Sequence, residues 1–469
     1  MNDSNSGGKY TIDMTHGPLF GKIIRFVLPL IATYLLQLLF NAADLIVIGH
    51  FASHEAMAAV GATTGFNVLL LNIFFGLSVG VNVLTARYKG ARNRKNISRT
   101  VHTSTAVALY GGIIMGVIGI LVSRPVLELM ATPPAILPKA SLYMWIYCAG
   151  VPFVVLYNFG SAVLRALGDT RRPLIFMVIA GILNVLLNLF FVRVFHWDVA
   201  GVATATLISN ALSAVLVLGV LTRARDASRL FWNQLKLHGP IFLDMLKIGL
   251  PAGIQGSFFS ISNLIIQSSI NSFGAAAIAG NTAALSLESM VHVCTQAFYY
   301  TTISFVGQNH GAQKYKRIAR SILLCLAVST LMGVLAGWTV RLFGKPLLKI
   351  YTPSAEVIEW GLIRLNLMML IYFLCNIMDV ISGALRGLGH SIKPTVTTLL
   401  GVCVFRVAWV FWIFPLKPTL LNLLISYPVS WGLVIVVNGI ILYWVCRGMF
   451  RAAAHPDGQL PGFGTLKNA

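Results

Sequence analysis

Three acidic residues lie inside long apolar runs of this sequence, where an ionised side chain is hard to accommodate. They are Asp44, Glu288 and Asp379, and the whole 469-residue chain has only 14 acidic residues. A charge at the centre of a bilayer costs roughly 2.5–3.5 kcal/mol on insertion scales, so such a side chain should face a cavity or a partner. Each carboxyl is therefore a candidate for binding a cation or a substrate, with a structural pairing between helices as the alternative.

Arg406 is the cation that the same argument singles out, because it also lies within an apolar run. The sequence leaves its role open. It can pair with Asp379 or Glu288 in a structural ion network, or it can bind substrate.

Polar side chains accompany Asp44 on neighbouring apolar runs. Asn41 lies three residues before Asp44, and Asn184 lies four residues before Asn188, so each pair shares one helical face. The full set is Gln37, Asn41, Asp44, Asn184, Asn188, Thr204, Thr206 and Asn210. If their helices adjoin, these oxygens form a pocket suited to a proton or Na⁺. The alternative is that the amides and hydroxyls hold the helices together.

The second half of the chain is rich in aromatic and thioether side chains, which can re-pack around varied ligands. We take Tyr300 and Met290 as the principal candidates for substrate contact. The wider set also includes Phe258, Phe259, Phe298, Tyr299, Met368, Met369, Tyr372 and Trp409.

Composition indicates what must position these residues. Apolar residues make up 57% of the chain and charged residues 10%, whereas soluble domains carry about 25% charged residues. A membrane span needs about 20 apolar residues. Twelve runs qualify, at 20–48, 55–86, 98–124, 138–162, 172–195, 199–222, 243–272, 277–306, 319–343, 357–383, 394–415 and 419–446. The prediction is an all-α integral membrane protein with twelve transmembrane helices.

The basic residues predict the orientation. With the N-terminus in the cytoplasm, 26 of the 35 Lys and Arg residues fall in cytoplasmic segments, Arg165 and Arg386 among them. Arg364 is one of eight assigned to the outer side, and Arg406 alone is assigned to a span. Cytoplasmic loops of membrane proteins carry this excess, so both termini are predicted to be cytoplasmic. The net charge of +21 is then explained by lipid contact rather than by nucleic acid.

The chain also repeats itself. Pro29 and Pro251 lie in similar contexts, Gly90 matches Gly311, and VLRALGDTRRP at 163–173 matches ALRGLGHSIKP at 384–394. We expect Gly90 and Gly311 to end helices in the left-handed conformation, and we expect two pseudo-symmetric lobes of six helices. The predicted parts are a cytoplasmic tail at 1–19, an N-lobe at 20–222, a cytoplasmic linker at 223–242, a C-lobe at 243–446 and a cytoplasmic tail at 447–469.

With these features the sequence resembles the multidrug and toxic compound extrusion (MATE) family. The resemblance rests on NAADLIVIGHF at 41–51, FVGQNHGAQKYKRIAR at 305–320 and the two turns just quoted. It covers about residues 18–447 and is nearest to the prokaryotic DNA-damage-inducible-like branch. It implies a V-shaped fold in which Asp44 couples transport to an ion, within a cluster that includes Asn184, Asn188 and Thr206. Many relatives carry Asp where this chain has Asn188, which leaves Asp44 as the main titratable group of that lobe.

The predicted function is a cation-coupled antiporter, driven by H⁺ or Na⁺, that exports organic cationic or amphipathic small molecules by alternating access. No HExxH, P-loop or nucleotide fingerprint occurs, so we predict no enzyme activity, no cofactor beyond the coupling ion and no metal site apart from Na⁺ at Asp44. The predicted protein is a monomer in the plasma membrane. The rivals are a flippase for a lipid-linked saccharide from the same superfamily, a polytopic membrane enzyme and a passive channel.

Overall fold

The computed structural model describes residues 10–51, 53–130 and 132–454, which form helices joined by short loops. The N-terminal half contains α1 (Leu19–Phe51), α2 (His54–Gly90), α3 (Arg94–Ala106), η1 (Val107–Gly111), α4 (Gly112–Leu129), α5 (Leu137–Leu167), α6 (Arg171–Leu189), η2 (Phe190–Val194) and α7 (Asp198–Thr222). The connection to the second half contains η3 (Trp232–Gln234). The C-terminal half contains α8 (Gly239–Asn271), α9 (Ala275–Gly311), α10 (Tyr315–Leu342), α11 (Gly344–Tyr351), α12 (Ala355–Ile371), α13 (Phe373–Gly387), α14 (Ile392–Thr398), η4 (Leu399–Val404), α15 (Phe405–Ala408), η5 (Trp409–Ile413), η6 (Phe414–Leu416) and α16 (Leu420–Ala454).

Most of these helices can cross a membrane. Within the described residues, nine helical segments are long and apolar enough, and a tenth results if α12 and α13, bent by 49°, count as one span. Helices α8 and α9, with 33 and 37 residues, are also long enough to cross a membrane. They are more polar than the other spans because both line the cavity described below. With these two, the twelve predicted spans all have helical counterparts.

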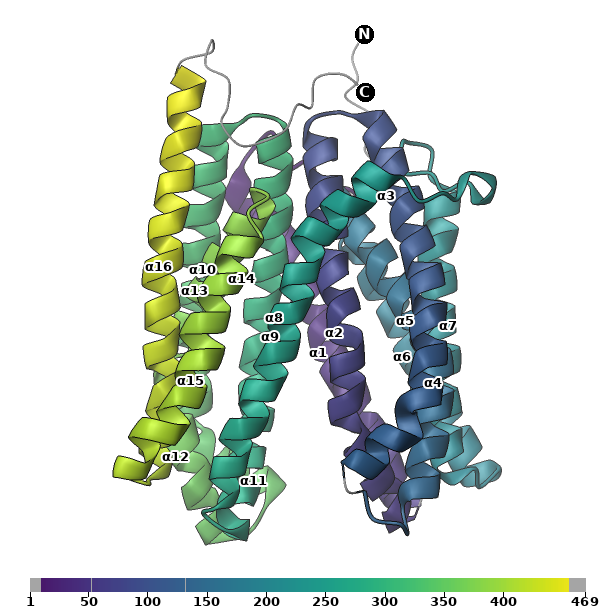
Figure 1. The fold of residues 1–469 in the computed structure, drawn as a ribbon, viewed down its shortest axis with the longest axis vertical. Helices are drawn as coiled ribbons and strands as arrows, with labels where there is room; N and C mark the ends of the chain where they lie inside the picture. Colours follow the sequence, from purple (N-terminus) through teal and green to yellow (C-terminus); the bar gives the residue numbers. More distant parts are fainter. Residues whose placement is uncertain (1–9, 52, 131, 455–469) are drawn as a thin grey trace.

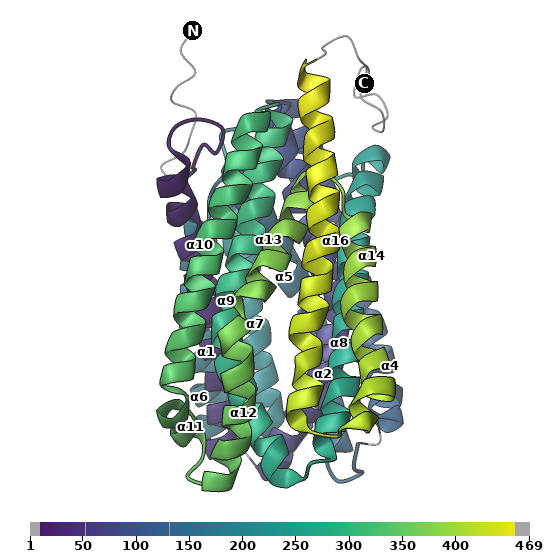
Figure 2. The ribbon, with the colours of Figure 1, turned by 90° about the vertical axis from the view of Figure 1, so that its left-hand side faces the viewer.

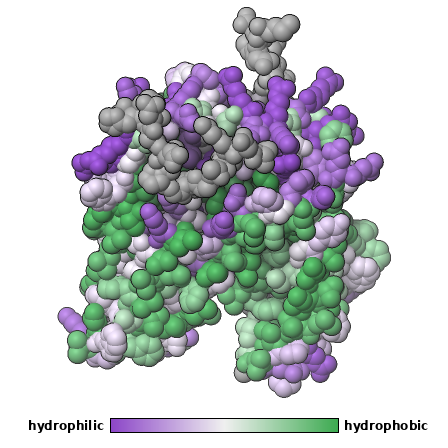
Figure 3. All heavy atoms as spheres, turned by 45° about the horizontal axis from the view of Figure 1, so that its top comes forward, coloured by the Kyte–Doolittle hydropathy of each residue, from purple (hydrophilic) through white to green (hydrophobic). Residues whose placement is uncertain are grey.

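The helices form two lobes, α1–α7 and α8–α16, which converge at the end that carries the termini and diverge at the other end (Figure 1). A quarter turn shows α9, α10 and α16 running along most of the height of the C-lobe, with α13 above α12 (Figure 2). Hydrophilic residues gather at the end with the termini, and a broad apolar band lies below them (Figure 3). A notch separates the lobes at the opposite end in the same view. This is the all-α, two-lobed membrane architecture that the sequence predicts.

Small residues allow the lobes to meet closely. A Cβ added to Gly76 on α2 would lie 2.1 Å from the backbone nitrogen of Gly253 on α8, and one added to Gly249 would lie 2.6 Å from the Cα of Leu77. Real Cβ atoms do not approach backbone so closely, so larger residues would force the helices apart. The lobes are therefore joined backbone to backbone along α2 and α8.

The prediction that Gly90 and Gly311 end helices in the left-handed conformation is wrong. Neither residue has a positive φ; Arg92 and Gln313, two residues later, occupy the left-handed region at φ 54° and 55°. A Cβ on Gly90 would instead lie 1.9 Å from the carbonyl oxygen of Gln308, and one on Gly311 would lie 1.9 Å from that of Arg87. These glycines let the ends of α2 and α9 cross at the junction of the lobes.

The helix ends follow the repeat but depart in places from the predicted boundaries. Gly168 and Gly389 end α5 and the turn after α13 at φ 100° and 88°, values that glycine adopts without strain. The loop between the lobes spans residues 223–238, and α16 continues to Ala454 rather than ending at 446. Of the two predicted tails, residues 1–9 and 455–469 lie outside the described residues.

A segment before α1, residues 10–18, crosses from one lobe to the other, and we call it the N-terminal strap. On the N-lobe side, the amide of Ile12 donates to the carbonyl oxygen of Gly168 at 3.0 Å. The guanidinium of Arg172 lies 5.2 Å from the ring centre of Tyr10. The strap is thus fixed to the turn that follows α5.

On the C-lobe side, the strap is held by α9 and α10. Arg317 donates to the carbonyl oxygens of Met14, Gly17 and His16 at 3.0, 2.8 and 2.7 Å. Asn309 donates to the Met14 carbonyl at 3.2 Å. The Met14 side chain is fully buried in an apolar cluster with residues of α1, α9 and α13. The strap therefore ties the lobes together at their converging end.

Candidate functional site

A chain of hydrogen bonds links three N-lobe helices at Asp44. The side-chain nitrogen of Asn188 on α6, Nδ2, donates to Asp44 Oδ1 on α1 at 2.5 Å and to Asn184 Oδ1 at 3.3 Å. The amide nitrogen of Asn184 donates to Thr206 Oγ1 on α7 at 3.4 Å. The structure thus brings together Asp44, Asn184, Asn188 and Thr206, and we call these four residues the N-lobe cluster.

The N-lobe cluster has oxygen atoms that can act as ligands for a small cation. Among the described residues, Asp44 has no ion-pair partner, and its hydrogen-bond partner Asn188 is neutral. The side-chain oxygen of Asn188, Oδ1, is buried without a hydrogen-bond partner in the described part of the chain. A carboxylate, an orphaned amide oxygen and a hydroxyl are ligands suited to Na⁺ or to a hydrated proton. Asn41 lies on an exposed part of α1 outside these hydrogen bonds.

A cavity of about 680 Å³ lies between the two lobes. Helices α1, α2, α5 and α6 line it from the N-lobe, and α8, α9, α13, α15 and α16 line it from the C-lobe, together with Tyr372 at the break between α12 and α13. The predicted site residues at its wall are Gln37, Glu288, Tyr300, Asp379 and Arg406, and further aromatic candidates there are Phe259, Tyr299 and Tyr372. A cavity of this size suits a drug-sized organic molecule.

Glu288 is held by a cation that the sequence reasoning placed elsewhere. Arg364 on α12 donates from Nε to Glu288 Oε2 at 2.8 Å, and its second guanidinium nitrogen lies 2.8 Å from the same oxygen. Arg364 also donates to Asn281 Oδ1 at 3.0 Å. Its side chain is buried inside the C-lobe, so its assignment to the outer side is wrong. The partner of Glu288 is Arg364 and not Arg406.

Arg406 lies in an aromatic setting instead of an ion pair. Its Nε donates to Ser430 Oγ at 2.9 Å, and its guanidinium lies 3.9 Å from the ring centre of Tyr427. Asp379 lines the cavity and makes no hydrogen bond or ion pair with the described residues. The predicted pairing of Arg406 with Asp379 is therefore not found.

Two arginines assigned to the cytoplasmic surface lie inside the protein. Arg165 at the end of α5 and Arg386 at the end of α13 are 7% and 4% exposed and line the cavity. Arg386 donates to the hydroxyl of Tyr299 and, at 2.7 Å, to Gln255 Oε1. The guanidinium of Arg165 lies 4.9 Å from the ring centre of Tyr300. Counting them as surface charges was wrong, because these two helix ends face the cavity between the lobes.

Met290 does not reach the cavity. Its side chain is 44% exposed, on a face of α9 away from the cavity wall. Phe298, Met368 and Met369 are buried in apolar clusters, and Phe258 is exposed. The missed residues Arg165 and Arg386 had one signal, since they occupy equivalent positions in the two repeated turns. Arg364 had no such signal.

The comparisons with known proteins match this architecture. The model of the MatE family matches residues 29–190 and 251–412, one segment in each lobe. The two matches begin at Pro29 and Pro251, the first pair in the internal repeat. The chain belongs to the MatE family, whose named relatives are multidrug resistance and export proteins rather than enzymes.

Named relatives cover most of the chain. The probable multidrug resistance protein YpnP of Bacillus subtilis is 27% identical over 84% of this chain and 88% of its own length. The multidrug export protein MepA of Staphylococcus aureus is 22% identical over 87% and 91%, and an FAD transporter of Shewanella oneidensis is 25% identical over 82% and 86%. A crystal structure of MATE in the bent conformation matches with TM-score 0.87 and 21% identity, covering 95% of this chain and 100% of that chain. That structural likeness supports the fold.

Proposed function

We propose that this protein exports organic small molecules by alternating access, as an antiporter driven by H⁺ or Na⁺ through Asp44. The observation that carries the proposal is a carboxyl group whose hydrogen-bond partner is neutral, next to an orphaned amide oxygen, in a lobe beside the central cavity. Multidrug export by the named relatives YpnP and MepA supports the transported class.

The shape supports the direction of the cycle. The lobes and the strap close the end that carries the termini, and the lobes diverge at the other end (Figure 1). With the basic, termini-bearing end in the cytoplasm, the structure is outward-facing. In this state the coupling ion enters at Asp44, and substrate leaves from the cavity. Breaking the strap and the α2–α8 contact then opens the cytoplasmic side.

The energetics are sufficient for export. One inward charge at 100 mV supplies about 2.3 kcal/mol, which supports roughly a fortyfold gradient of a neutral substrate before any pH gradient is added. We place the protein in the plasma membrane, with both termini cytoplasmic, and expect a monomer because one chain contains both lobes and the whole cavity.

The test is efflux from proteoliposomes under an imposed gradient of either H⁺ or Na⁺. Loaded fluorescent organic compounds should leave against their own gradient when one of these ions runs inward. Efflux that ignores both gradients would reject coupled antiport.

A flippase for a lipid-linked saccharide is a second candidate. It requires a cationic cavity for a diphosphate, and the arginines at the cavity wall are more numerous than the sequence indicated. Movement of a labelled lipid-linked saccharide between leaflets, without dependence on the H⁺ or Na⁺ gradient, would favour this candidate over the antiporter.

A further inference from the structure

The cavity has a surplus of positive charge. Its wall carries Arg165, Arg386 and Arg406 against Glu288 and Asp379, and Glu288 is already neutralised by Arg364. The acidic residues at the wall can therefore neutralise only part of the positive charge of the three arginines. Uncompensated charge away from bulk water is costly, and a bound anion would relieve it.

The same three arginines have unused donors. Nε of Arg165, Nε of Arg386 and one terminal nitrogen of Arg406 are buried without a hydrogen-bond partner among the described residues. All three side chains are more than nine-tenths buried. Arg165 makes neither a hydrogen bond nor an ion pair within the described part of the chain, and its guanidinium lies 4.9 Å from the ring centre of Tyr300. Planar guanidinium groups with free donors are suited to carboxylate and phosphate oxygens.

Aromatic rings surround these donors. Tyr34 and Tyr300 are stacked with ring centres 6.1 Å apart at the cavity wall. Tyr299 and Tyr300 meet edge to face at 5.1 Å. Flat faces beside guanidinium groups favour a planar ligand, because stacking and charge are satisfied together.

We infer that the substrate is a planar aromatic compound that carries a carboxylate or phosphate group. This inference rests on the proposed export function and departs from the organic cation expected from the sequence. Arg165 and Arg386 bind the oxyanion near the closed end, and the tyrosines hold the ring system.

Binding can be tested with flavin mononucleotide and riboflavin, which share a ring system but differ by a phosphate. Purified protein should bind flavin mononucleotide more tightly. Arg165→Gln should weaken that binding roughly tenfold to hundredfold, since it removes a charge-assisted contact, and should leave riboflavin unchanged. Arg171→Gln, an exposed arginine in the same turn, is the matched control. Thermal unfolding of Arg165→Gln shows whether any loss of binding arises from misfolding.

Transport separates this inference from the proposed function. Exchange of one monoanion outward for one proton inward moves two charges, so 100 mV alone supports a ratio on the order of a thousandfold. Exchange of a monovalent cation for a proton moves none. Flavin mononucleotide efflux that rises with membrane potential is the expected result. Coupled efflux of ethidium but not of flavin mononucleotide would overturn the inference and keep the antiporter; coupled efflux of neither would count against both.

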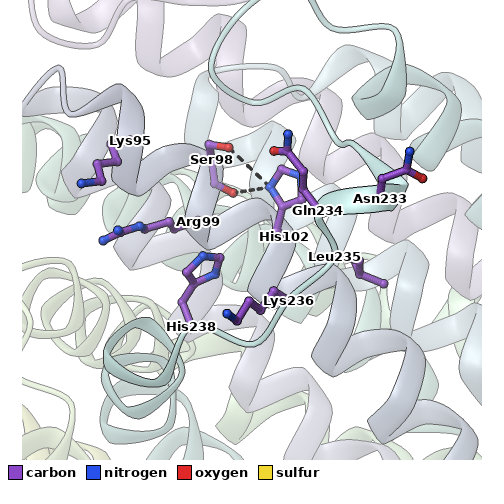
Figure 4. A pocket seen from close by; sticks show the side chains of 9 residues that line it. All are labelled: Lys95, Ser98, Arg99, His102, Asn233, Gln234, Leu235, Lys236 and His238. Carbon is purple, nitrogen blue, oxygen red and sulfur yellow. Dashed lines mark hydrogen bonds between the residues drawn. The ribbon is translucent and has the colours of Figure 1, made fainter.

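A second inference comes from a separate basic pocket at the end that carries the termini. This pocket, of about 580 Å³, lies between α3 and the loop before α8 (Figure 4). Its lining residues are Lys95, Ser98, Arg99, His102, Asn233, Gln234, Leu235, Lys236 and His238, with no acid among them. Lys95, Arg99 and Lys236 form no ion pair with the described residues.

The wall of this pocket is built by specific hydrogen bonds. His102 Nδ1 lies 2.7 Å from the Ser98 carbonyl oxygen, so this nitrogen carries the proton, and Nε2 accepts from the amide of Phe231 at 3.1 Å. The amide of His238 donates to Thr103 Oγ1 at 3.2 Å. The loop is thus fixed to α3, with its cations facing the same space.

Electrostatics and exposed side chains point to the same kind of ligand. Burial lowers the pKa of His238, and Arg99, Lys236 and His102 contribute to this lowering, as expected where positive potential accumulates. Trp232 and Leu237 on the same loop are 52% and 47% exposed. Basic residues beside exposed aromatic and aliphatic side chains are typical of the headgroup level of a membrane.

We propose that this pocket binds the phosphate headgroup of an anionic phospholipid. Native mass spectrometry of protein from phosphatidylglycerol nanodiscs should show retained lipid. The triple variant Lys95→Gln, Arg99→Gln and Lys236→Gln should retain roughly tenfold less. A matched triple variant at the exposed residues Lys316, Arg320 and Arg451 should retain as much as the wild type.

Three results would contradict this proposal. Equal loss in both triple variants would indicate a general charge effect. Displacement of the lipid by millimolar inorganic phosphate would indicate a site for free anions. Retention of phosphatidylcholine at the same level would exclude charge recognition. Thermal unfolding of each variant shows whether the fold is kept.

Discussion

The two lobes share a scaffold but use their buried polar groups in different ways. At the repeat offset of 221, Asp379 in the C-lobe corresponds to Asn158 in the N-lobe, and Thr206 in the N-lobe corresponds to Tyr427. Asp44 corresponds to an isoleucine, either Ile265 or Ile266 at offsets of 221 and 222. The shared scaffold therefore depends on neither set of charged residues, and the two lobes differ in the buried charges they carry.

The difference lies in what surrounds each carboxyl. Asp44 has an amide partner that brings no charge, whereas Glu288 is fixed by a guanidinium at 2.8 Å. A carboxyl beside neutral dipoles can gain or lose a positive ion at moderate cost. A carboxyl paired with arginine is held in place, because losing either charge would leave the other buried and unpaired. The N-lobe is therefore suited to ion exchange, and the C-lobe is suited to a constant charge pattern around substrate.

The largest expected effect comes from removing the exchangeable charge. Asp44→Asn should reduce gradient-driven efflux to the level of protein-free vesicles, since no titratable group remains in the N-lobe cluster. The free energy of unfolding should change by only about 1 kcal/mol or less, because the amide keeps a hydrogen bond to Asn188. Proteoliposome efflux and thermal unfolding measure the two quantities.

The double variant Asp44→Asn and Asn188→Asp sharpens this prediction. It exchanges the Asp and the Asn that share one hydrogen bond, so the N-lobe cluster keeps one carboxyl and part of the coupled efflux should return. Full efflux in the single Asp44→Asn variant would remove Asp44 from the mechanism. Glu288→Gln is not a matched control here, because it alters stability as described next.

The second effect is on stability and belongs to the C-lobe. Glu288→Gln leaves Arg364 buried without its counter-charge, which should cost about 3–5 kcal/mol of folding free energy. The double variant Glu288→Met and Arg364→Met removes both charges and should regain most of that loss. Denaturation in detergent at several temperatures compares them. A single variant as stable as the wild type would mean that the ion pair does not fix Glu288.

The third effect tests the strap that joins the lobes. Arg317→Gln removes donors to three strap carbonyls, and a single such bond to a charged group contributes about 1.5–3 kcal/mol. The population open at the strap end should rise about tenfold or more. Distances between spin labels on the two lobes measure that population. Arg320→Gln, one turn further along α10 and exposed, should leave it unchanged.

The sequence predicts the helices and the repeat well because both depend on local pattern. Twelve apolar runs and three matches at an offset of 221 or 222 residues are visible without any knowledge of packing. The N-lobe cluster is also within reach, since Asn184 and Asn188 share a helical face. The C-lobe site is harder, because Arg165, Arg386 and Arg364 look like charges near helix ends. Only the packing in three dimensions, with Arg165 and Arg386 at the cavity wall and α12 against α9, shows that these arginines lie inside.

The smallest effect concerns the charge within the strap. Partial burial by itself would raise the pKa of Asp13, but hydrogen bonds from Thr15 and the contact with His16 lower it from 3.8 to about 2. A carboxyl with a lowered pKa in the folded state stabilises that state above its ordinary pKa, and this contribution is lost as the pH falls toward 2. Between pH 5 and 8, Asp13 therefore gives no pH dependence to strap docking.

Amide hydrogen exchange at Ile12 and Thr15, corrected for the intrinsic rate at each pH, can measure this contribution. Asp13→Asn should increase exchange only a few-fold at pH 7, because the side chain is about half exposed and water screens exposed charges. The difference from the wild type should shrink below pH 4, where the native carboxyl begins to protonate. If the difference in exchange rate between Asp13→Asn and the wild type stays constant down to pH 2, the charge of Asp13 does not stabilise the strap. The strap would then depend on the contacts of Met14 and Arg317 with the C-lobe.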